Sequence, residues 1–288
     1  MKIFISGAGG EVGNDLIKRL LEKNLKVVAN IRDLKKIKYY DPNLKWIKHD
    51  FIKNLNKKMK IQIIVNCIAA HDFSKKNKFI DLIRSNFLSM KNLINFAKKN
   101  KVRLFINLST VSVYGKFNEK NLNENITPIY QDNLGVTKLM GENLLSKSKI
   151  SYLNLRLPGI LTNSNNFERP WLKKIINNMK HNKKIILSNP NTSFNNVIDT
   201  IELVKFIHFI ISKKKYKTNL KGTFNLSATK PLKLIKIIKL IKANYRSDSK
   251  IKVNNIKKNS FIFKNKKIFR ELKYLPSSTK SVVLRNLI

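Results

Sequence analysis

The first third of the chain alternates short apolar runs with amphipathic stretches. Residues 2–6 (KIFIS) form an apolar run that leads directly into glycines, and residues 11–24 (EVGNDLIKRLLEKN) follow with apolar side chains at helical spacing. A further apolar run occupies residues 26–31 (KVVANI). This order of strand, glycine turn, helix and strand predicts a βαβ unit, because two parallel strands need a crossover such as this helix.

The alternation continues to residue 157. The pattern predicts a buried strand over 63–70, a long helix over 75–100, a strand over 103–109, a helix that carries Lys138, and a strand over 151–157. Strands that alternate with helices in this way are typical of an α/β fold with a doubly wound parallel sheet, which is Rossmann-like.

Beyond Pro158 the regularity loosens. The pattern predicts three helices and two short strands, at residues 170–182, 199–212 and 231–244, and at residues 183–188 and 222–227. Pro231 would occupy the first turn of the last helix. Neither a glycine- or serine-rich linker nor an internal repeat is found in the sequence. We therefore predict a Rossmann-like core over residues 1–158 and a smaller C-terminal substrate lobe over residues 159–288, integrated with the core.

The composition excludes several classes of protein. Hydrophobic residues make up 42% of the chain, which is enough for a folded core. The most apolar segment, residues 203–211 (LVKFIHFII), is shorter than the roughly 18 residues of a membrane span. The single cysteine, Cys67, excludes an internal disulfide, and the four histidines are too scattered for a metal cluster. We expect a cytoplasmic protein without a membrane span and without a metal.

The net charge of +42 has two interpretations. Lysine, asparagine and isoleucine dominate every region, as an AT-biased coding sequence would produce. A nucleic-acid-binding face would instead concentrate its cations and interleave arginine and aromatic side chains. Because the cations are mostly lysines spread along the chain, we favour the first interpretation and expect no specific nucleic-acid partner. The excess charge still suits an anionic small molecule.

The glycine turn carries the clearest chemical signal. Gly7, Gly10 and Gly13 stand three residues apart, directly after a strand and at the start of a helix. In such a turn the first glycine permits the tight bend, the second lets the backbone approach a pyrophosphate, and the third lets the helix pack on the sheet. The helix N-terminus then offers unpaired N–H groups to the phosphates. A tight turn without a ligand is the alternative interpretation.

The end of the second strand bears on the choice between NAD and NADP. An acidic residue there commonly binds the ribose 2′-OH of NAD. This strand ends Ala29-Asn30-Ile31-Arg32-Asp33, so its acidic residue, Asp33, comes one position later than expected. Arg32 could pair with the 2′-phosphate of NADP, or it could be solvated. We predict NAD or NADP as cofactor, with NADP favoured.

At this point the chain resembles the extended short-chain dehydrogenase/reductase family, the NAD-dependent epimerase/dehydratase group that acts mainly on nucleotide sugars. The resemblance runs nearly end to end. It rests on the segments ISGAGGEVG, NCIAA, NFLSMKNLINFAKKNKVRLFINLSTVSVYG, TKLMGE, LRLPGIL, GTFNLSATKPLKLIKII and ELKYLP. Of these, STVSVYG followed by TKLMGE is specific when it lies downstream of the glycine turn.

The resemblance implies roles for individual residues. Thr110 would hydrogen-bond the reacting oxygen of the substrate, and Lys138 would bind the nicotinamide ribose hydroxyls. The cofactor-binding positions, from the pyrophosphate to the adenine and the nicotinamide side, would be Gly7, Gly10, Glu11, Val12, Gly13, Arg32, Asp50, Phe51, Ala69, Ala70 and Lys138. Asn86, in the long helix, would either order the neighbouring strand or be solvated.

The family's catalytic tyrosine should stand four residues before Lys138, where this sequence has Leu134. That spacing puts both side chains on one helix face, so that the ammonium lowers the phenol pKa from about 10. Leucine can neither donate nor accept the proton. Tyr130 lies two helical turns before Lys138, and Tyr114 belongs to a segment that the family uses structurally, so neither replaces the tyrosine cleanly.

Two further departures affect the expected reaction. Family 4,6-dehydratases usually have Asp-Glu directly after the threonine, whereas here Val111 and Ser112 follow, which disfavours dehydration. The frequent substrate-diphosphate arginine of the family is replaced near Asn195.

The sequence is compatible with two functions. The first is an NAD(P)-dependent oxidoreductase or epimerase that acts on a nucleotide sugar, in surface polysaccharide biosynthesis. The second is a catalytically impaired dinucleotide-binding member of the family, with a sensing or partner role. The oligomeric state is open, with a homodimer among the options.

Overall fold

The structure is a computed structural model that describes residues 1–37, 39–71, 78–162, 170–254 and 260–287. The chain packs into two compact units: unit 1 comprises Met1–Phe117, Thr127–Leu157 and Leu203–Phe224, and unit 2 comprises Asn118–Ile126, Pro158–Glu202 and Asn225–Ile288. This division differs from the predicted linear one in two segments, residues 118–126 and 203–224. The second of these returns to unit 1 because it adds a strand to the central sheet.

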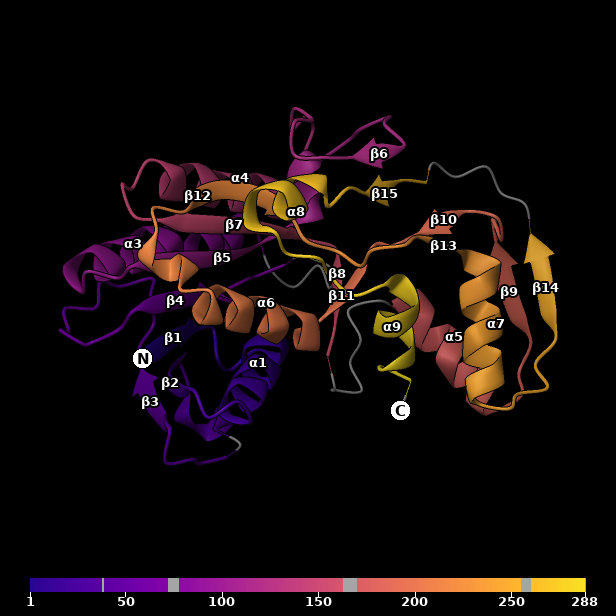
Figure 1. The fold of residues 1–288 in the computed structure, drawn as a ribbon, viewed down its shortest axis with the longest axis horizontal. Coiled ribbons are helices and arrows are strands. Elements are labelled where there is room, and N and C mark those ends of the chain that lie inside the picture. The colour runs from indigo at the N-terminus through magenta and orange to yellow at the C-terminus, as the bar shows by residue number, and fades with distance from the viewer. Residues whose placement is uncertain (38, 72–77, 163–169, 255–259, 288) are drawn as a thin grey trace. The chain divides into compact units, whose positions relative to one another are not determined.

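Unit 1 is built on a seven-stranded sheet with helices packed along it (Figure 1). The strand order is β12-β7-β5-β4-β1-β2-β3, and the pairings from β7 through to β3 are all parallel. The strands are β1 (Lys2–Ser6), β2 (Lys26–Ile31), β3 (Leu44–Lys48), β4 (Ile63–Asn66), β5 (Leu104–Thr110), β7 (Tyr152–Leu157) and β12 (Lys221–Asn225). The order reverses between β1 and β4, so the ligand crevice of such a sheet is expected at their carboxyl ends. The predicted doubly wound fold is confirmed.

The helices of unit 1 bury the faces of this sheet. They are α1 (Glu11–Leu21), α2 (Phe79–Leu82), α3 (Ser89–Lys99), α4 (Asn133–Ser146) and α6 (Thr200–Ser212), with 3₁₀ turns at η1 (Leu34–Lys36), η3 (Val111–Tyr114) and η4 (Lys215–Lys217). The helix predicted over 75–100 contains a π-helical segment, η2 (Ile83–Leu88), between α2 and α3, and its start lies outside the described residues. The inner strands β1, β4 and β5 are buried along most of their lengths, which explains why their sequences are apolar runs.

A row of polar side chains crosses this buried sheet at one level. Ser6 Oγ donates to Asn66 Oδ1 (2.7 Å), Asn66 Nδ2 to Asn107 Oδ1 (3.1 Å), Asn107 Nδ2 to Asn154 Oδ1 (3.0 Å) and Asn154 Nδ2 to Thr223 Oγ1 (3.3 Å). The row follows the register of the strands, which pairs Ser6 with Asn66, Asn66 with Asn107 and Asn107 with Asn154. These bonds offset the cost of burying amides among apolar side chains. We call this row the asparagine ladder.

Unit 2 holds short strands and helices around its own core. Its strands form two-stranded sheets: β9 (Ile185–Ser188) with β14 (Ile251–Asn254), β8 (Gly159–Leu161) with β11 (Val197–Asp199), β10 (Ser193–Phe194) with β13 (Leu232–Lys233), and β6 (Asn121–Leu122) with β15 (Ile262–Phe263). Its helices are α5 (Pro170–Lys180), α7 (Leu234–Asn244), α8 (Lys266–Leu272) and α9 (Thr279–Leu284). The apolar faces of α5, α7 and α9 meet one another and β9 in one cluster.

The prediction that Pro231 lies in the first turn of a helix is wrong. The helix α7 begins at Leu234, because Leu232 and Lys233 stay extended to pair with β10. None of the helices in the described part of the chain is both long and apolar enough to cross a membrane.

Candidate cofactor and catalytic site

The glycine turn between β1 and α1 needs its glycines for steric reasons. Gly7 has φ +73°, and a Cβ there would lie 2.8 Å from the backbone carbonyl carbon of Cys67, just after β4. A Cβ on Gly13 would lie 2.5 Å from the carbonyl oxygen of Gly7. The turn is closed by a hydrogen bond of 3.1 Å from Gly10 N to Gly7 O. Glycine is thus required at the bend and at the helix–strand contact.

The middle glycine leaves room at the helix N-terminus. Gly10 is the N-cap of α1 and provides no side-chain cap, so the amides of the first turn, from Glu11 to Gly13, are available to an anion. A Cβ on Gly10 would approach only Gly7 O, at 3.4 Å, and would otherwise project into open space. The cradle therefore fits a pyrophosphate.

A cavity of about 530 Å³ opens beside this turn. Of the predicted cofactor residues it is lined by Gly7, Gly10, Arg32, Asp50, Phe51, Ala69 and Ala70. Residues that the sequence analysis missed also line it, namely Gly9, Asn30, Ile31, Asp33, Lys36, His49, Cys67, Ile68, Ser85 and Ser89. Glu11, Val12 and Gly13 follow in the adjoining first turn of α1. Thr110 and Lys138 are not among the residues that line this cavity.

Two cations line the cavity where β2 ends. Arg32 and Lys36 both contribute to its wall. The carboxylate of Asp33 accepts the N–H of Lys35 at 3.0 Å and so caps the 3₁₀ turn η1. The acidic residue of this loop is therefore engaged with backbone, and the sequence offered no signal for Lys36 because only the 3₁₀ turn brings it back to the cavity.

The loop after β3 is fixed by hydrogen bonds to its backbone. Asn92 of α3 donates to the carbonyls of Phe51 and Ile52, each at 2.8 Å, and Asp50 accepts the N–H of Ile52 at 3.1 Å. The ring of Phe51 is 1% exposed and packs edge-on against Phe4 at 6.0 Å. Phe51 therefore anchors the loop in the core while Asp50 lies at the rim.

Asn86 orders the segment after β4, as one of its two interpretations predicted. Its side chain accepts from Ala70 N at 2.8 Å and donates to Ala70 O at 3.0 Å and to Thr137 Oγ1 at 3.0 Å. The π-helical segment carries this asparagine, as such segments often do at functional sites. The bonds tie the β4 loop to the helix that carries Lys138.

Lys138 is buried and held by backbone carbonyls. Its Nζ donates to Ile68 O at 2.9 Å and to Leu108 O at 3.3 Å, at the ends of β4 and β5. The helix α4 that presents it begins at an Asp132 cap, which accepts Gly135 N at 2.7 Å. A Cβ on Gly135 would lie 2.2 Å from the carbonyl oxygen of Ser112, so the helix start is seated closely on the turn after β5.

Leu134 stands one turn before Lys138 on α4 and is 7% exposed. Thr110 is the last residue of β5, and its Oγ1 accepts the N–H of Ser112 at 3.3 Å. Leu134 thus occupies the position where the resemblance predicts a tyrosine, on a helix start that is capped by Asp132 and seated on the turn after β5.

Neither nearby tyrosine substitutes for it. Tyr114 is fully buried, with the guanidinium of Arg156 4.6 Å from its ring centroid. Arg156 is in turn bound to Glu142 at 2.8 Å, so this cluster is structural. Tyr130 lies before α4 with φ +48° and is 80% exposed.

Cys67 does not supply the proton either. Burial raises the pKa of its thiol to about 12, against a smaller lowering by the charge of Lys138. The thiol therefore stays protonated at neutral pH and does not act as a base.

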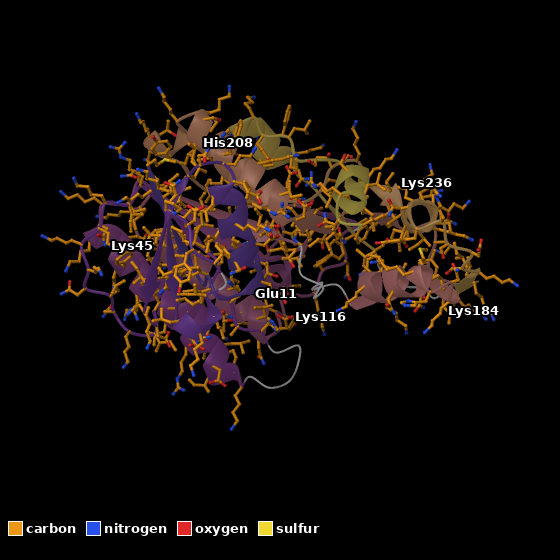
Figure 2. All side chains as sticks on the ribbon, turned by 90° about the horizontal axis from the view of Figure 1, so that it is seen from below. Glu11, Lys45, Lys116, Lys184, His208 and Lys236 are labelled. Carbon is orange, nitrogen blue, oxygen red and sulfur yellow. The ribbon has the colours of Figure 1, made fainter. Side chains whose placement is uncertain are left out.

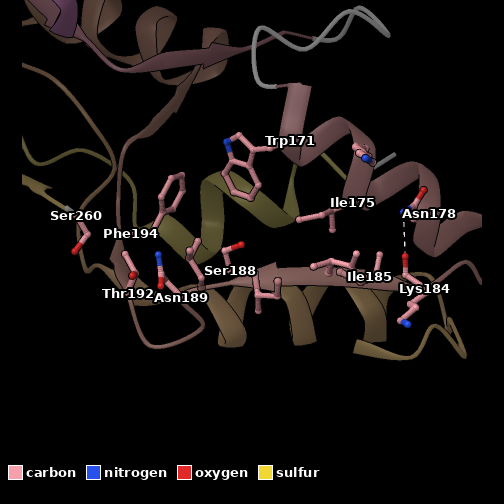
Figure 3. Close-up of a pocket in the computed structure, with 14 residues that line it drawn as sticks. Trp171, Ile175, Asn178, Lys184, Ile185, Ser188, Asn189, Thr192, Phe194 and Ser260 are labelled. Carbon is pink, nitrogen blue, oxygen red and sulfur yellow. Dashed lines mark hydrogen bonds between the residues drawn. The ribbon is translucent and has the colours of Figure 1, made fainter. Parts of the chain in front are cut away.

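Unit 2 contains a second cavity, of about 660 Å³ (Figure 3). Trp171 and Phe194 stand edge to face at one end, with ring centroids 5.6 Å apart. At the other end Asn178 Nδ2 donates to the carbonyl of Lys184 at 3.2 Å. The wall between them is formed by α5 and β9, which contribute Ile175 and Ile185. An apolar pocket with aromatic rings and a few amides and hydroxyls suits a flat heterocycle.

Asn195, near the position of the family's diphosphate arginine, is structural. It is buried, donates to Ala228 O at 3.0 Å and Phe263 O at 2.9 Å, and accepts Phe263 N at 3.0 Å. It therefore pins β15 and offers nothing to a diphosphate.

The sequence matches the model of the NAD dependent epimerase/dehydratase family over residues 3–226, so the chain belongs to this family. A dTDP-D-glucose 4,6-dehydratase from Dictyostelium discoideum is 26% identical over 243 residues, 74% of this chain and 56% of the relative. An uncharacterized UDP-glucose epimerase, YtcB of Bacillus subtilis, is 26% identical over 174 residues, 53% of each chain. The chain thus spans little more than half the length of these curated relatives.

Solved structures share the fold. The enzyme WbmG of Bordetella bronchiseptica, in complex with NAD and UDP, matches with a TM-score of 0.80 over 99% of this chain and 93% of that chain, at 15% identity. The UDP-N-acetylglucosamine 4-epimerase of Bacillus cereus matches with a TM-score of 0.78 over 100% and 98%, at 16% identity. At such identities the similarity shows the Rossmann-like fold, and NAD is bound in the first of these neighbours.

Proposed function

We propose that this protein is a nicotinamide-dinucleotide-dependent enzyme that epimerises or reduces a nucleotide sugar. The observation that carries the proposal is the glycine cradle at the N-terminus of α1, where backbone amides face a cavity at the point where the strand order reverses. The buried Lys138 on α4 supports it, because its ammonium is held beside Ile68, a residue that lines the same cavity.

The cofactor would lie along this cavity from Asp50 to Ala70. When bound, a nicotinamide dinucleotide supplies hydride transfer to or from a sugar carbon. Of the chain's own groups, we assign Lys138 to the ribose hydroxyls and the Thr110 hydroxyl to the reacting oxygen of the sugar. The proton on that oxygen has no donor at position 134.

We propose NADP rather than NAD as the preferred form. Arg32 and Lys36 together give the adenosine end of the cavity two positive charges, and the carboxylate of Asp33 is occupied by a backbone amide. Two cations favour a 2′-phosphate, whereas a ribose hydroxyl pair calls for an acceptor.

The cavity in unit 2, taken by itself, has a lining that would suit a nucleobase. The edge-to-face pair of Trp171 and Phe194 offers a stacking surface, and Asn178, Asn189 and Thr192 offer hydrogen bonds to a base. Lys174 and Lys184 also line this cavity and would suit the diphosphate that follows the base.

For the reaction itself we favour epimerisation or reduction over dehydration. A curated relative is a dehydratase, but the two positions after Thr110 are Val111 and Ser112, without the carboxylates that elimination of water requires.

The second candidate is a catalytically impaired family member that binds its cofactor for a sensing or partner role. Leu134 favours it, because neither Tyr114 nor Tyr130 stands in for the tyrosine. The assembled state of Lys138 and its supporting bonds favours the enzyme.

Calorimetry with NADPH, NADP⁺, NADH and NAD⁺ tests the cofactor assignment. We expect NADPH to bind most tightly and Arg32→Ala to weaken NADPH binding by about tenfold, as loss of a charge-assisted phosphate contact would. Lys35→Ala is the matched control, because Lys35 is in the same turn but does not line the cavity. Absence of uptake of any dinucleotide at millimolar supply would reject the proposed function.

A further inference from the structure

Eleven cations of unit 1 line two cavities along one edge of its sheet. Nitrogen-tipped side chains project outward all over the ribbon (Figure 2), as composition alone would produce. Two cavities nevertheless stand out at the amino ends of the strands. Six of the 12 residues that line one of them, and five of the 13 that line the other, are lysine or arginine, against 59 in the 288 residues of the chain. Lysine is common among the exposed residues of the whole chain, but these two linings are richer still: 11 of their 14 exposed residues are lysine or arginine.

These residues form one surface, which we call the basic edge. It comprises Lys2, Lys26, Lys45, Lys57, Lys58, Lys60, Lys98, Lys101, Arg103, Lys149 and Lys217, all exposed. The two cavities are joined by Asn100, which accepts Met59 N at 2.6 Å and donates to Lys57 O at 3.1 Å. Gln62 links β1 to β5 in the same way, since its carbonyl accepts Arg103 N at 2.9 Å and its side chain accepts Lys2 N at 2.7 Å. The edge is therefore continuous.

The charges on the basic edge are not neutralised within it. Lys2 and Lys26 are register partners on adjacent strands, an arrangement in which like charges repel. Among the described residues no carboxylate lines either cavity, and the nearby Asp41 accepts the N–H of Asn43 at 2.7 Å. Part of the charge complements helix C-termini, as at Lys98 at the end of α3, but Lys45, Lys57 and Lys58 lie on no helix. An external polyanion would relieve this repulsion.

The chemistry of the edge suits a lipid surface better than a nucleic acid. Ten of its eleven cations are lysines, which act as point charges, whereas base readout uses arginine forks. Tyr216 is the one aromatic residue among those described that line the two cavities, so stacking of bases has no platform. Seven strands at a spacing of about 4.8 Å make an edge roughly 29 Å long, so its cations can meet many phosphates of an extended surface at once.

We propose that the basic edge is a docking surface for a membrane that contains anionic phospholipids. Binding is peripheral and electrostatic, and it is reversed by salt because the contacts are exposed charges. The cofactor cavity lies at the carboxyl ends of the same parallel strands, so docking by the amino edge leaves it open. This proposal does not depend on the proposed enzymatic function.

Sedimentation of the full chain with mixed phosphatidylglycerol and phosphatidylcholine vesicles tests it, with pure phosphatidylcholine vesicles as reference. An edge variant with Lys26→Gln, Lys45→Gln, Lys58→Gln and Arg103→Gln is compared with a control variant of equal net charge. The control carries Lys173→Gln, Lys236→Gln, Lys239→Gln and Lys252→Gln, all exposed lysines of unit 2.

We expect wild type and control to bind the anionic vesicles and the edge variant to lose a hundredfold or more in partition, at about fivefold per surface cation. Equal losses in both variants would show that only net charge acts and would overturn the proposal. So would equal binding of wild type to the two kinds of vesicle, or a competing duplex RNA that strips the protein from vesicles at equal phosphate concentration. NADPH affinity and urea unfolding of the edge variant check that its fold is intact.

Discussion

Two strand-to-helix junctions of unit 1, the turn between β1 and α1 and the start of α4 after β5, lie at the same end of the sheet. They differ in which functional groups of the family they contain. The glycine turn, Gly7 to Gly13, has the backbone amides and the free space that the proposed pyrophosphate site requires. The start of α4, Asp132 to Lys138, retains its cap, its close seating on Ser112 and its buried ammonium, but has Leu134 where the family has a phenol. The proposed binding site therefore consists of backbone geometry, whereas the proposed catalytic site depends on a side chain that the helix start does not need for its own contacts.

Restoring the phenol at the second junction should give the largest effect. We expect Leu134→Tyr to raise turnover of a nucleotide sugar by roughly 10²–10⁴-fold, the usual contribution of general acid–base catalysis. The measurement is conversion of the sugar itself in a panel of UDP and dTDP sugars, followed by chromatography of the products, because an epimerisation leaves no net change in the cofactor; NADPH oxidation is followed beside it to detect a reduction. Leu134→Phe, which has the ring but not the hydroxyl, is the matched control and should stay at the wild-type rate.

If Leu134→Tyr binds NADPH normally and still does not turn over any sugar of the panel, the second junction lacks more than its phenol. That outcome would favour the sensing or partner role over the enzyme.

At the first junction, two glycines should separate stability from binding. Gly13→Ala places a methyl group 2.5 Å from Gly7 O, and we expect it to lower the free energy of unfolding by about 2–3 kcal/mol, as overpacking does. Gly10→Ala meets only Gly7 O at 3.4 Å, so its stability should stay within about 0.5 kcal/mol of wild type. Its methyl group projects toward the cavity, so NADPH affinity should fall. Urea unfolding and calorimetry measure the two quantities.

Unchanged NADPH affinity in Gly10→Ala would mean that the pyrophosphate does not sit at this turn. The glycine turn would then have only a structural role.

The asparagine ladder connects the two junctions and offers a smaller effect. Asn66 Oδ1 accepts Ile68 N at 3.1 Å, and Ile68 O accepts the ammonium of Lys138. Asn66→Leu and Asn154→Leu each leave buried amide partners unsatisfied, at about 2 kcal/mol of unfolding free energy. Only Asn66→Leu should also weaken NADPH binding, because only Asn66 binds the N–H of Ile68, the residue whose carbonyl accepts the Lys138 ammonium. Equal NADPH affinities in the two variants would make the ladder purely structural.

How much of this was readable from the sequence differs between the junctions. The strands Lys2–Ser6 and Lys26–Ile31 have the predicted bounds, because an apolar run flanked by glycine or charge is a local signal. The spacing of the glycines is likewise a local signal, because it reflects the steric requirements of a tight turn and of a close contact between helix and strand. Lys138 and Leu134 were recognised by resemblance, since spacing alone cannot tell a tyrosine's site from any other helix turn.

Features that depend on distant partners were not readable. The asparagine ladder needs the strand order, which places Asn66, Asn107 and Asn154 side by side although they are far apart in sequence. The same holds for the basic edge, whose lysines seemed evenly spread until the parallel strands brought their amino ends together. The helix start at Leu234 was missed because pairing with β10 overrides the preference of Pro231 for a first turn.

The smallest predicted effect is on the pH dependence of stability and comes from a buried ion cluster in unit 2. The same cluster tests whether the losses of NADPH affinity predicted for the variants at Gly10 and Asn66 are local. Glu202 accepts the hydroxyl of Tyr274 at 2.6 Å and lies 3.1 Å from Arg285, which also binds Asp199. Burial opposes its ionisation, but hydrogen bonds from Ser277, Tyr274 and Arg285 outweigh burial and hold the pKa of Glu202 below its ordinary value.

A carboxylate whose pKa is lower in the folded than in the unfolded state adds stability above its ordinary pKa of about 4.3, and this stability is lost as the pH falls through the folded pKa. Glu202→Gln should therefore flatten the loss of urea stability between about pH 5 and pH 3, whereas Glu271→Gln, at an exposed pair with Arg270, should not. Neither variant should change NADPH affinity at neutral pH. If Glu202→Gln does weaken NADPH binding, losses of affinity at Gly10 and Asn66 would report general destabilisation, and the two junctions could no longer be compared by affinity alone.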